Sequence, residues 1–399
     1  MFDIEGTRAT AKCYATEIED AAIEQIRTMC DQPFAEGARI RIMPDAHAGA
    51  GCTIGTTMTV TDKVVPNIVG VDIGCGMYTV DIGRGGLDLP ALDEACHTVP
   101  SGMRVWEGRK RRFDLTELAC YRQLKDTRRL ERSIGTLGGG NHFIEVDEAT
   151  DGTRYLVIHS GSRNLGVQVA SYYQHLAVEL RSGKGTYFEK RDELIATYKA
   201  EGRRKEIQAA LKRLKWEERE PDAPRDLCWL DGTYLDDYLH DVAICQRFAR
   251  LNRETMAEEI VRMCGLSDRD AFHTIHNYID TDEMILRKGA IAAHAGELVL
   301  IPLNMRDGSV LARGLGNEDW NFSAPHGAGR LMSRTDARAR LSVDEYREQM
   351  AGIYTTSVGE ATLDEAPGAY KSKEDIIGPI SEAVDIIEVM RPLFNFKAS

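Results

Sequence analysis

The sequence predicts an α+β fold in one large domain that spans residues 1–399. Stretches typical of strands and of helices follow one another without the regular βαβ rhythm of a parallel sheet, and no internal repeat is visible. No stretch has the composition of a flexible linker, so one domain is favoured over two. The segment at about 182–226 is dense in charges of both signs, which predicts an exposed helical insertion.

Composition narrows the classes of protein that need to be considered. The chain is 43% apolar and 28% charged, as is usual for a globular protein. No apolar run could span a bilayer and the first residues lack a signal-peptide core, so we expect a cytoplasmic protein with no membrane partner. Nine cysteines without a CxxC pair argue against a disulfide framework and against a zinc ribbon. The net charge of −13 argues against a generally basic surface that coats nucleic acid, although a local basic cleft remains compatible with it.

The stretch 67–76, NIVGVDIGCG, is the centre of the predicted site. Its β-branched residues predict a short buried strand, and Asp72 and Cys75 stand at the end of that strand. A carboxylate and a thiolate together suit a divalent transition metal. The alternative interpretation is a glycine-rich turn that holds an ordinary buried cysteine.

Apolar periodicity predicts the other main elements. The sequence predicts strands at 39–43, 56–60, 155–158 and 298–301, and helices at about 164–181, 234–263, 342–353 and 376–392.

Five histidines follow predicted strands or glycine-rich loops: His47, His142, His159, His276 and His326. Together with Asp72 and Cys75 they supply the ligand types of a metal site, and two metals that share one ligand could stabilise an attacking and a leaving oxygen. His326 differs because Arg330 and Arg334 follow it. Its imidazole could attack phosphorus while the guanidinium groups neutralise phosphate charge.

Residues 104–132 are rich in lysine and arginine, including Arg128 and Arg129. This concentration fits either a solvated helix face or a track for nucleic-acid phosphates, and the sequence leaves both interpretations open.

Eight motifs occur in a fixed order along nearly the whole chain: MPDAHAGAG, GVDIGCG, GTLGGGNHFIE, HSGSRNLG, HNY, RKGA, RGLGNE and HGAGRLMSR. Together they closely resemble the RtcB family of GTP-dependent RNA ligases. The resemblance implies a single mixed domain with a central metal-containing cleft. It also implies an enzyme that uses GTP and two manganese(II) ions to join an RNA 3′-phosphate or 2′,3′-cyclic phosphate to a 5′-hydroxyl, through histidine-bound GMP and a 3′-guanylylated RNA.

The resemblance also assigns roles to residues. Asp72, Cys75 and His142 match the ligands of one metal, while Cys75, His159 and His276 match those of the other, so Cys75 would bridge. His326 matches the histidine that takes GMP, and Asp45 matches a polar residue needed near the centre of the site. The implied nucleotide contacts are Asn141, His142, Phe143, Ile144, Glu145, His276, Asn277, Pro302, Leu303, Asn304, Met305, Ser309, His326, Gly327, Ala328, Gly329, Tyr370 and Lys397. Arg128, Arg129, Arg163, Arg330 and Arg334 match the residues that bind RNA phosphates.

Two other functions remain open at this point. One is a metal-dependent phosphatase or cyclic phosphodiesterase that does not ligate, and the other is a nucleotide- or RNA-binding protein without turnover. For a ligase the expected partners are GTP, RNA with 3′-phosphate or cyclic phosphate and 5′-hydroxyl ends, and an archease-like activator, in tRNA splicing or RNA repair.

Overall fold

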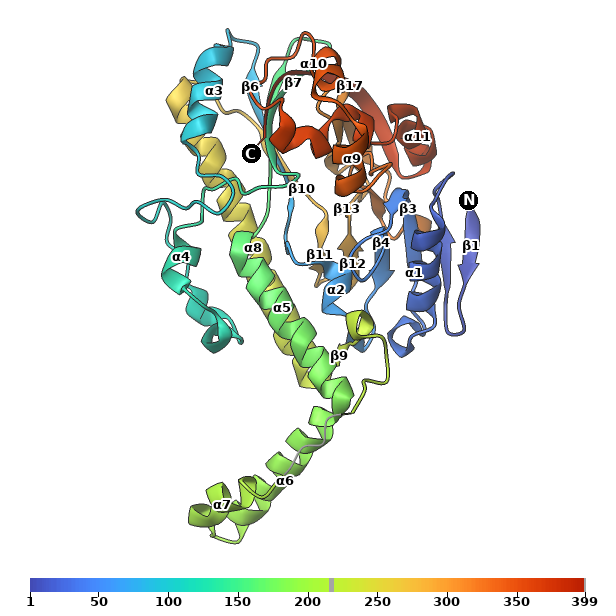
Figure 1. Cartoon of the computed structure of the whole chain (residues 1–399), viewed down its shortest axis with the longest axis vertical. Coiled ribbons are helices and arrows are strands. Elements are labelled where there is room, and N and C mark those ends of the chain that lie inside the picture. Colours follow the sequence, from blue (N-terminus) through green and yellow to red (C-terminus); the bar gives the residue numbers. More distant parts are fainter. Residues whose placement is uncertain (215–218, 398–399) are drawn as a thin grey trace.

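Two sheets form the body of the protein in the computed structural model, which describes residues 1–214 and 219–397 (Figure 1). The first sheet has the order β1-β2-β3-β4-β12-β11, and only β2 and β3 pair in parallel. Its strands are Phe2–Glu5 (β1), Thr10–Cys13 (β2), Ile40–His47 (β3), Ile54–Thr59 (β4), Ile285–Lys288 (β12) and Asn277–Asp280 (β11).

The second sheet, with the order β10-β6-β8-β7-β17-β15-β14, is antiparallel throughout. Its strands are Ala271–Ile275 (β10), Gly76–Gly83 (β6), Arg154–Ser160 (β8), Phe143–Glu148 (β7), Val384–Lys397 (β17), Gly308–Gly314 (β15) and Leu298–Asn304 (β14). Its edge strands approach each other, since the backbone N–H of Leu300 donates to Oγ1 of Thr274 at 3.2 Å. The sheet is therefore strongly curled, and its concave face can enclose a site.

Two short strand pairs complete the β structure: Ala290–Ala292 (β13) with Ser323–Pro325 (β16), and Lys63–Val64 (β5) with Leu230–Asp231 (β9). The helices are Asp20–Cys30 (α1), Pro66–Val69 (α2), Leu89–Thr98 (α3), Thr127–Glu131 (α4), Arg163–Glu179 (α5), Gly185–Ala200 (α6), Ile207–Leu211 (α7), Gly232–Cys264 (α8), Arg334–Arg340 (α9), Val343–Gln349 (α10) and Lys373–Ile377 (α11).

The long helix α8 crosses the body beside the second sheet, and α5 lies along it (Figure 1). The two helices contact each other through buried side chains, because the Tyr173 hydroxyl donates to Oδ2 of Asp241 at 2.8 Å and the Tyr173 ring packs on Tyr238. Within the described residues, no helix combines the length and the apolar character needed to cross a membrane.

The mixed α+β class predicted from the sequence is confirmed, and the helix predicted at 234–263 corresponds to α8. Two predicted elements are wrong. Residues 67–76 do not form a strand: α2 ends at Val69, and a turn follows in which Val71 is 52% exposed. Pro66 at the start of α2 and Gly70 with φ 95° at its end explain the change, because they begin and end a helical turn despite the β-branched residues between them.

The predicted helix at 376–392 is also wrong, because most of it belongs to the 14-residue strand β17. The first half of β17 pairs with β15 and the second half with β7, so this strand joins two halves of the curled sheet. Its Val, Ile and Phe residues favour a strand, and Pro392 lies at a register shift where a missing N–H is tolerated.

The segment at about 182–226 contains α6 and α7, which project away from the body (Figure 1). Residues 215–218 of this predicted insertion lie outside the described residues.

Candidate active site

Strand ends bring the predicted metal ligands together. Cys75 directly precedes β6 and His142 directly precedes β7, while His159 is near the end of β8 and His276 follows β10. Because β6 and β7 run antiparallel to β8, and β6 also runs antiparallel to β10, these starts and ends meet at one edge of the sheet. The register confirms this, since Met77 and Phe143 both lie opposite His159.

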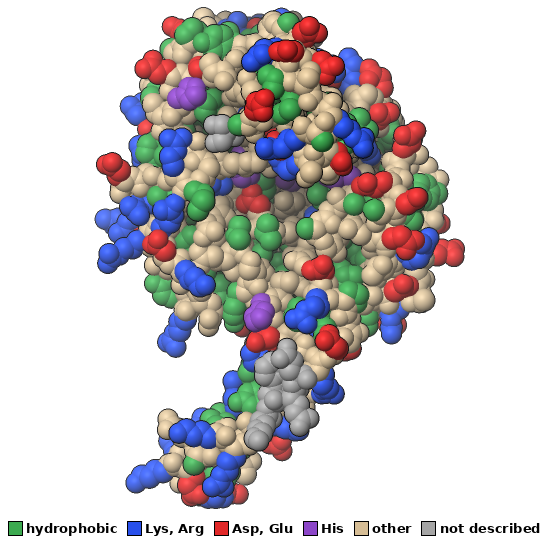
Figure 2. Space-filling view, viewed as in Figure 1, with side chains coloured by type: hydrophobic (Ala, Val, Ile, Leu, Met, Phe, Trp, Pro, Cys, Tyr) green, Lys and Arg blue, Asp and Glu red, His purple; other side chains and the backbone are tan. Residues whose placement is uncertain are grey.

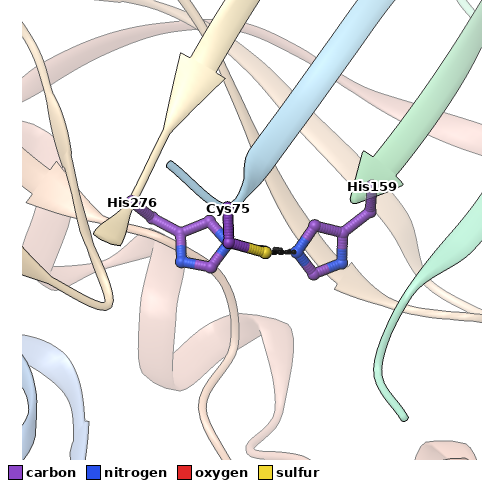
Figure 3. A group of neighbouring side chains, drawn as sticks. All are labelled: Cys75, His159 and His276. Atoms are coloured by element: carbon purple, nitrogen blue, oxygen red, sulfur yellow. Dashed lines mark hydrogen bonds between the residues drawn. The ribbon is translucent and has the colours of Figure 1, made fainter. Parts of the chain in front are cut away.

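Two ligand sets share Cys75: Asp72, Cys75 and His142 in one, and Cys75, His159 and His276 in the other. Its Sγ atom lies 3.3 Å from Nε2 of His159 (Figure 3). The same atom lies 3.5 Å from Nε2 of His142. Nε2 of His142 is 2.9 Å from Oδ2 of Asp72, and the Nε2 atoms of His159 and His276 are 3.0 Å apart. The other Asp72 oxygen, Oδ1, is buried without a hydrogen-bond partner among the described residues.

Backbone carbonyls fix the orientation of two of these rings. Nδ1 of His142 donates to the carbonyl of Leu137 at 2.8 Å, and Nδ1 of His159 donates to the carbonyl of Asn141 at 3.1 Å. With the ring proton on Nδ1, each Nε2 presents a lone pair to the cluster, as metal-binding histidines do. The converging lone pairs, the thiol and the unpaired carboxylate oxygen therefore fit a pair of divalent transition metals.

The protonation states agree with this assignment. Burial holds the pKa values of His159 and His276 well below the ordinary value, so both rings are neutral near pH 7. Burial opposes ionisation of Asp72, but the neighbouring His142 and Arg163 side chains still leave the pKa of the carboxyl below its ordinary value. Burial, together with the Asp72 charge, raises the pKa of the Cys75 thiol, so a bound dication would have to supply the charge that favours the thiolate.

Asn252 and Arg253, adjacent in α8, hold the loops that carry these ligands. Oδ1 of Asn252 accepts hydrogen bonds from the backbone N–H groups of Gly135 and Thr136, and its Nδ2 donates to Ser160 and Gly161. NH1 of Arg253 donates to the carbonyl of Gly74 at 2.6 Å.

NH1 of Arg253 also donates to the carbonyl of Ser160, at 2.8 Å. Burial lowers the pKa of Arg253 only to about 10, so the guanidinium is charged at neutral pH beside the ligand sets. Sequence reasoning missed both residues, because on a long amphipathic helix their spacing does not distinguish them from other polar positions.

His326 follows β16 and lies beside the second ligand set. Its ring centroid is 4.9 Å from that of His276, and its Nδ1 is 2.6 Å from Oδ2 of Asp45, a fully buried residue of β3. Gly329, with φ +69°, allows the loop to pass against Asp45, because a Cβ atom there would collide with the Asp45 carbonyl. The pairing leaves Nε2 of His326 as the ring atom able to react.

A cavity of about 250 Å³ opens beside His326. Fourteen of the eighteen residues implied as nucleotide contacts line it: Asn141, Phe143, Glu145, His276, Pro302, Leu303, Asn304, Met305, His326, Gly327, Ala328, Gly329, Tyr370 and Lys397. The other four, His142, Ile144, Asn277 and Ser309, do not line it. Ile144 packs in the apolar core, and the Asn277 side chain accepts a hydrogen bond from the backbone N–H of Gly289.

Glu365 joins the polar residues at one end of this cavity, and the sequence did not single it out. Lys397 and Tyr370 both reach its Oε2 at 2.6 Å, and NH1 of Arg334 lies 2.7 Å from its Oε1. Burial opposes ionisation, but the charges of Lys397 and Arg334 lower the pKa of Glu365 to about 2. Arg330 also contacts this carboxylate, at 3.3 Å. Residues from three distant segments are therefore held together by one carboxylate.

The remaining arginines of the predicted RNA-binding set are dispersed. Arg163 is held by Thr136 and by the Gly102 carbonyl, near the glycine-rich loop. Arg128 and Arg129 are exposed on the short helix α4, and neither lines the cavity.

The fold and site define an α+β protein with paired metal-ligand sets beside a histidine-containing cavity. A family model described as tRNA-splicing ligase RtcB matches residues 25–119 and 112–398. The chain therefore belongs to the RtcB family, an RNA ligase family, as its motifs had predicted.

Bacterial and archaeal relatives cover nearly the whole chain. The chain is 33% identical to the RNA-splicing ligase RtcB of Escherichia coli (strain K12), over 95% of each chain. It is 27% identical to the tRNA-splicing ligase RtcB of Aeropyrum pernix, over 88% of this chain and 86% of that one. It is 26% identical to the tRNA-splicing ligase RtcB of Thermococcus kodakarensis, over 94% of this chain and 90% of that one.

Proposed function

We propose that the protein is a GTP- and manganese-dependent ligase that joins RNA 3′-phosphate or 2′,3′-cyclic phosphate ends to 5′-hydroxyl ends. Family membership supports the substrate class. The observation that carries the covalent mechanism is the pairing of His326 with buried Asp45, at the edge of a cavity and beside the two ligand sets. An imidazole held in this way is an activated nucleophile.

The first step forms a bond between Nε2 of His326 and the α-phosphorus of GTP and breaks the bond to the bridging oxygen, so that pyrophosphate leaves. The proton stays on Nδ1 of His326, which donates it in a hydrogen bond to the Asp45 carboxylate, and this carboxylate stabilises the positive charge that develops on the ring. Gly327 and Gly329 keep the loop narrow beside the reacting phosphorus, so the phosphate can approach Nε2.

The following steps transfer GMP and seal the RNA. A cyclic end is first opened by water to a 3′-phosphate. An oxygen of the 3′-phosphate attacks the phosphorus of histidine-bound GMP and releases His326, and the 5′-hydroxyl of the second RNA then attacks the activated 3′-phosphate and releases GMP. Arg163, Arg330 and Arg334 are the closest of the expected phosphate-binding residues to the site, and Arg128 and Arg129 would contact RNA further away.

Asp72, Cys75 and His142 would hold one manganese(II) ion, and Cys75, His159 and His276 the other. Two such ions neutralise phosphate charge and lower the pKa of a bound water or hydroxyl. The neutral state of His159 and His276 supports this role, because a protonated ring cannot ligate.

The biological setting is proposed from relatives. Their names point to tRNA splicing, and RNA repair uses the same ends. We further propose that the enzyme works in the cytoplasm, because the Cys75 thiol would stay reduced there. An archease-like protein is the proposed activator.

The decisive experiment uses GTP labelled at the α-phosphate with manganese(II), followed by a search for acid-labile GMP on the protein. The parent protein should be labelled and His326→Ala should not. His175→Ala, at an exposed histidine of α5, is the matched control and should be labelled like the parent. His326→Ala should still join an RNA that already carries a 3′-guanylylated end, because this substrate bypasses the first step.

Two outcomes contradict the proposal. Labelling of His326→Ala would place the nucleophile elsewhere. A labelled parent protein that removes phosphate but never joins RNA would favour a metal-dependent phosphatase or cyclic phosphodiesterase.

A further inference from the structure

A helical arm, residues 185–213, stands apart from the body of the protein (Figure 1). It is joined to α5 through the turn Leu180–Lys184, in which Gly183 has a non-helical φ of 99°. This residue redirects the chain away from the core. No residue of α6 or α7 is buried, and Phe188, near the base of the arm, packs against the apolar core as a partly buried side chain. The exposed side chains further out along the arm are available to a partner.

The outer part of the arm, residues 199–213, is basic, and we call it the basic tip. It contains six Lys or Arg residues and two Glu residues, a net charge of +4 in a chain whose net charge is −13. Figure 2 shows Lys and Arg side chains at the end of the arm, away from the hollow in the body of the protein. A strongly basic element in an acidic protein indicates an anionic partner.

The two acidic residues of the basic tip do not neutralise its outer cations. Glu201 and Glu206 both pair with Arg203, at 2.8 and 2.9 Å, and the Arg203 guanidinium lies 4.3 Å from the ring centroid of Tyr198. Arg203 thus stabilises the turn between α6 and α7. Five exposed cations remain, none with an ion pair among the described residues: Lys199, Arg204, Lys205, Lys212 and Arg213.

We infer that the basic tip binds phosphates in the body of a folded RNA, at a distance from the ends that are joined in the active site. This inference rests on the proposed function, which makes RNA the substrate. The tip shares no residue with the cavity beside His326, so it serves a part of the RNA that the active site does not hold.

RNA is favoured over an anionic membrane because residues 199–213 include none of the large apolar side chains that are exposed on the described surface. Membrane-binding helices combine basic residues with exposed apolar residues that enter the bilayer, and the tip has only the first of these. Phosphates on a flexible or folded RNA need only exposed cations, and their binding is sensitive to salt.

The test compares two variants with the same change in net charge. In the tip variant, Lys199, Arg204, Lys205, Lys212 and Arg213 are all replaced by Gln. In the control variant, five exposed cations of the body are replaced by Gln: Arg8, Arg27, Arg84, Arg262 and Arg347. Each is tested on a folded RNA of tRNA size and on short single-stranded oligonucleotides with the same ends.

The tip variant should bind the folded RNA about tenfold or more weakly at low salt, with a salt dependence shallower by up to about one unit of slope per lost contact. It should join the short oligonucleotides, and form protein-bound GMP, at the parent rate. The control variant should bind both RNAs like the parent.

Three results overturn the inference: unchanged affinity of the tip variant for the folded RNA, an equal loss in the control variant, or a loss of binding to vesicles containing anionic lipid while RNA binding stays intact. Failure of the proposed function would give a different result. In that case the parent, the tip variant and the control variant would all fail to form protein-bound GMP and to join the short oligonucleotides.

Discussion

Oδ2 of Asp45 lies 2.6 Å from Nδ1 of His326, although the two residues are 281 positions apart in the chain. Asp45 is fully buried and His326 borders the cavity, so the carboxylate determines which ring nitrogen of the histidine faces the cavity. A carboxylate that orients a histidine in this way also stabilises the ring when it becomes positively charged.

Asp45→Asn should therefore slow the formation of protein-bound GMP by about 10²–10⁴-fold. The amide preserves the shape of the side chain, but its NH₂ group can turn towards Nδ1 and favour the wrong tautomer. The measurement is the single-turnover rate of labelling by GTP, with metal content and thermal unfolding as controls. A parent-like labelling rate would contradict the assigned role of Asp45.

Cys75 belongs to both ligand sets, so Cys75→Ala should weaken the binding of both ions. Asp72→Asn should weaken only one site, since Asp72 belongs to a single set. Equilibrium dialysis with manganese(II) should find two bound ions in the parent and one in Asp72→Asn. In Cys75→Ala, both ions should bind more weakly than they do in the parent. The control is Cys264→Ala, which changes a partly exposed cysteine outside both sets. Two tightly bound ions in Cys75→Ala would exclude the bridging role.

Asn252→Ala should lower the free energy of unfolding by about 2–4 kcal/mol, because it removes the partners of four loop groups at once. It should also lower the affinity for manganese(II), since His142 follows the loop that contains Gly135 and Thr136, and His159 directly precedes Ser160. Urea unfolding and metal titration measure the two effects. Asn164→Ala, at an exposed position of α5, should change stability by less than about 0.5 kcal/mol. If Asn252→Ala has the same free energy of unfolding as the parent, these hydrogen bonds make no net contribution to stability.

Glu365 should make stability depend on acid pH. Its pKa is about 2 in the folded protein and 4.5 for an ordinary glutamate, so between these values the unfolded chain binds more protons. Stability should therefore be fully present above pH 4.5 and fall as pH drops towards 2, by up to about 3 kcal/mol from this group.

Glu365→Gln tests this dependence. The variant should be less stable than the parent at pH 7, because Lys397 and Arg334 lose their buried counter-charge, and the difference should shrink as pH falls below 4.5. Chemical unfolding at several pH values measures this difference in stability between the parent and the variant. The control is Glu94→Gln, which changes an exposed glutamate. An equal difference at pH 7 and pH 3 would exclude ionised Glu365 as its source.

Local sequence patterns predicted the fold class and the strand that delivers His159. Strand β7, which begins just after His142, and strand β8, which contains His159, have apolar runs next to glycine-rich or polar segments. Such runs keep their structure in most tertiary settings. The motifs also brought Asp72 and Cys75 into one site, even though the strand predicted for 67–76 is a helical turn. A turn and a strand end can place these side chains at the same edge, so the error did not reach the site.

Long-range pairing explains what the sequence did not predict. The strand β17 contains Asp385, Glu388 and Arg391, and only its pairing with β7 and β15 stabilises an extended conformation over 14 residues. Glu365 has no distinctive neighbours in the sequence, and its role arises from cations and a tyrosine that fold onto it. Asn252 likewise acts on loops that lie 91 to 117 positions away.

The end of β17 has a consequence for the timing of synthesis. Asn395 and Lys397 line the cavity, and Lys397 contacts Glu365. A ribosome makes the two candidate ligand sets and His326 well before these residues, so a nascent chain can contain all of these groups and still lack one wall of the cavity. Under the proposed function, GTP can bind only after β17 has left the ribosome and entered the sheet, so translation delays the proposed guanylylation of His326 until this wall is in place.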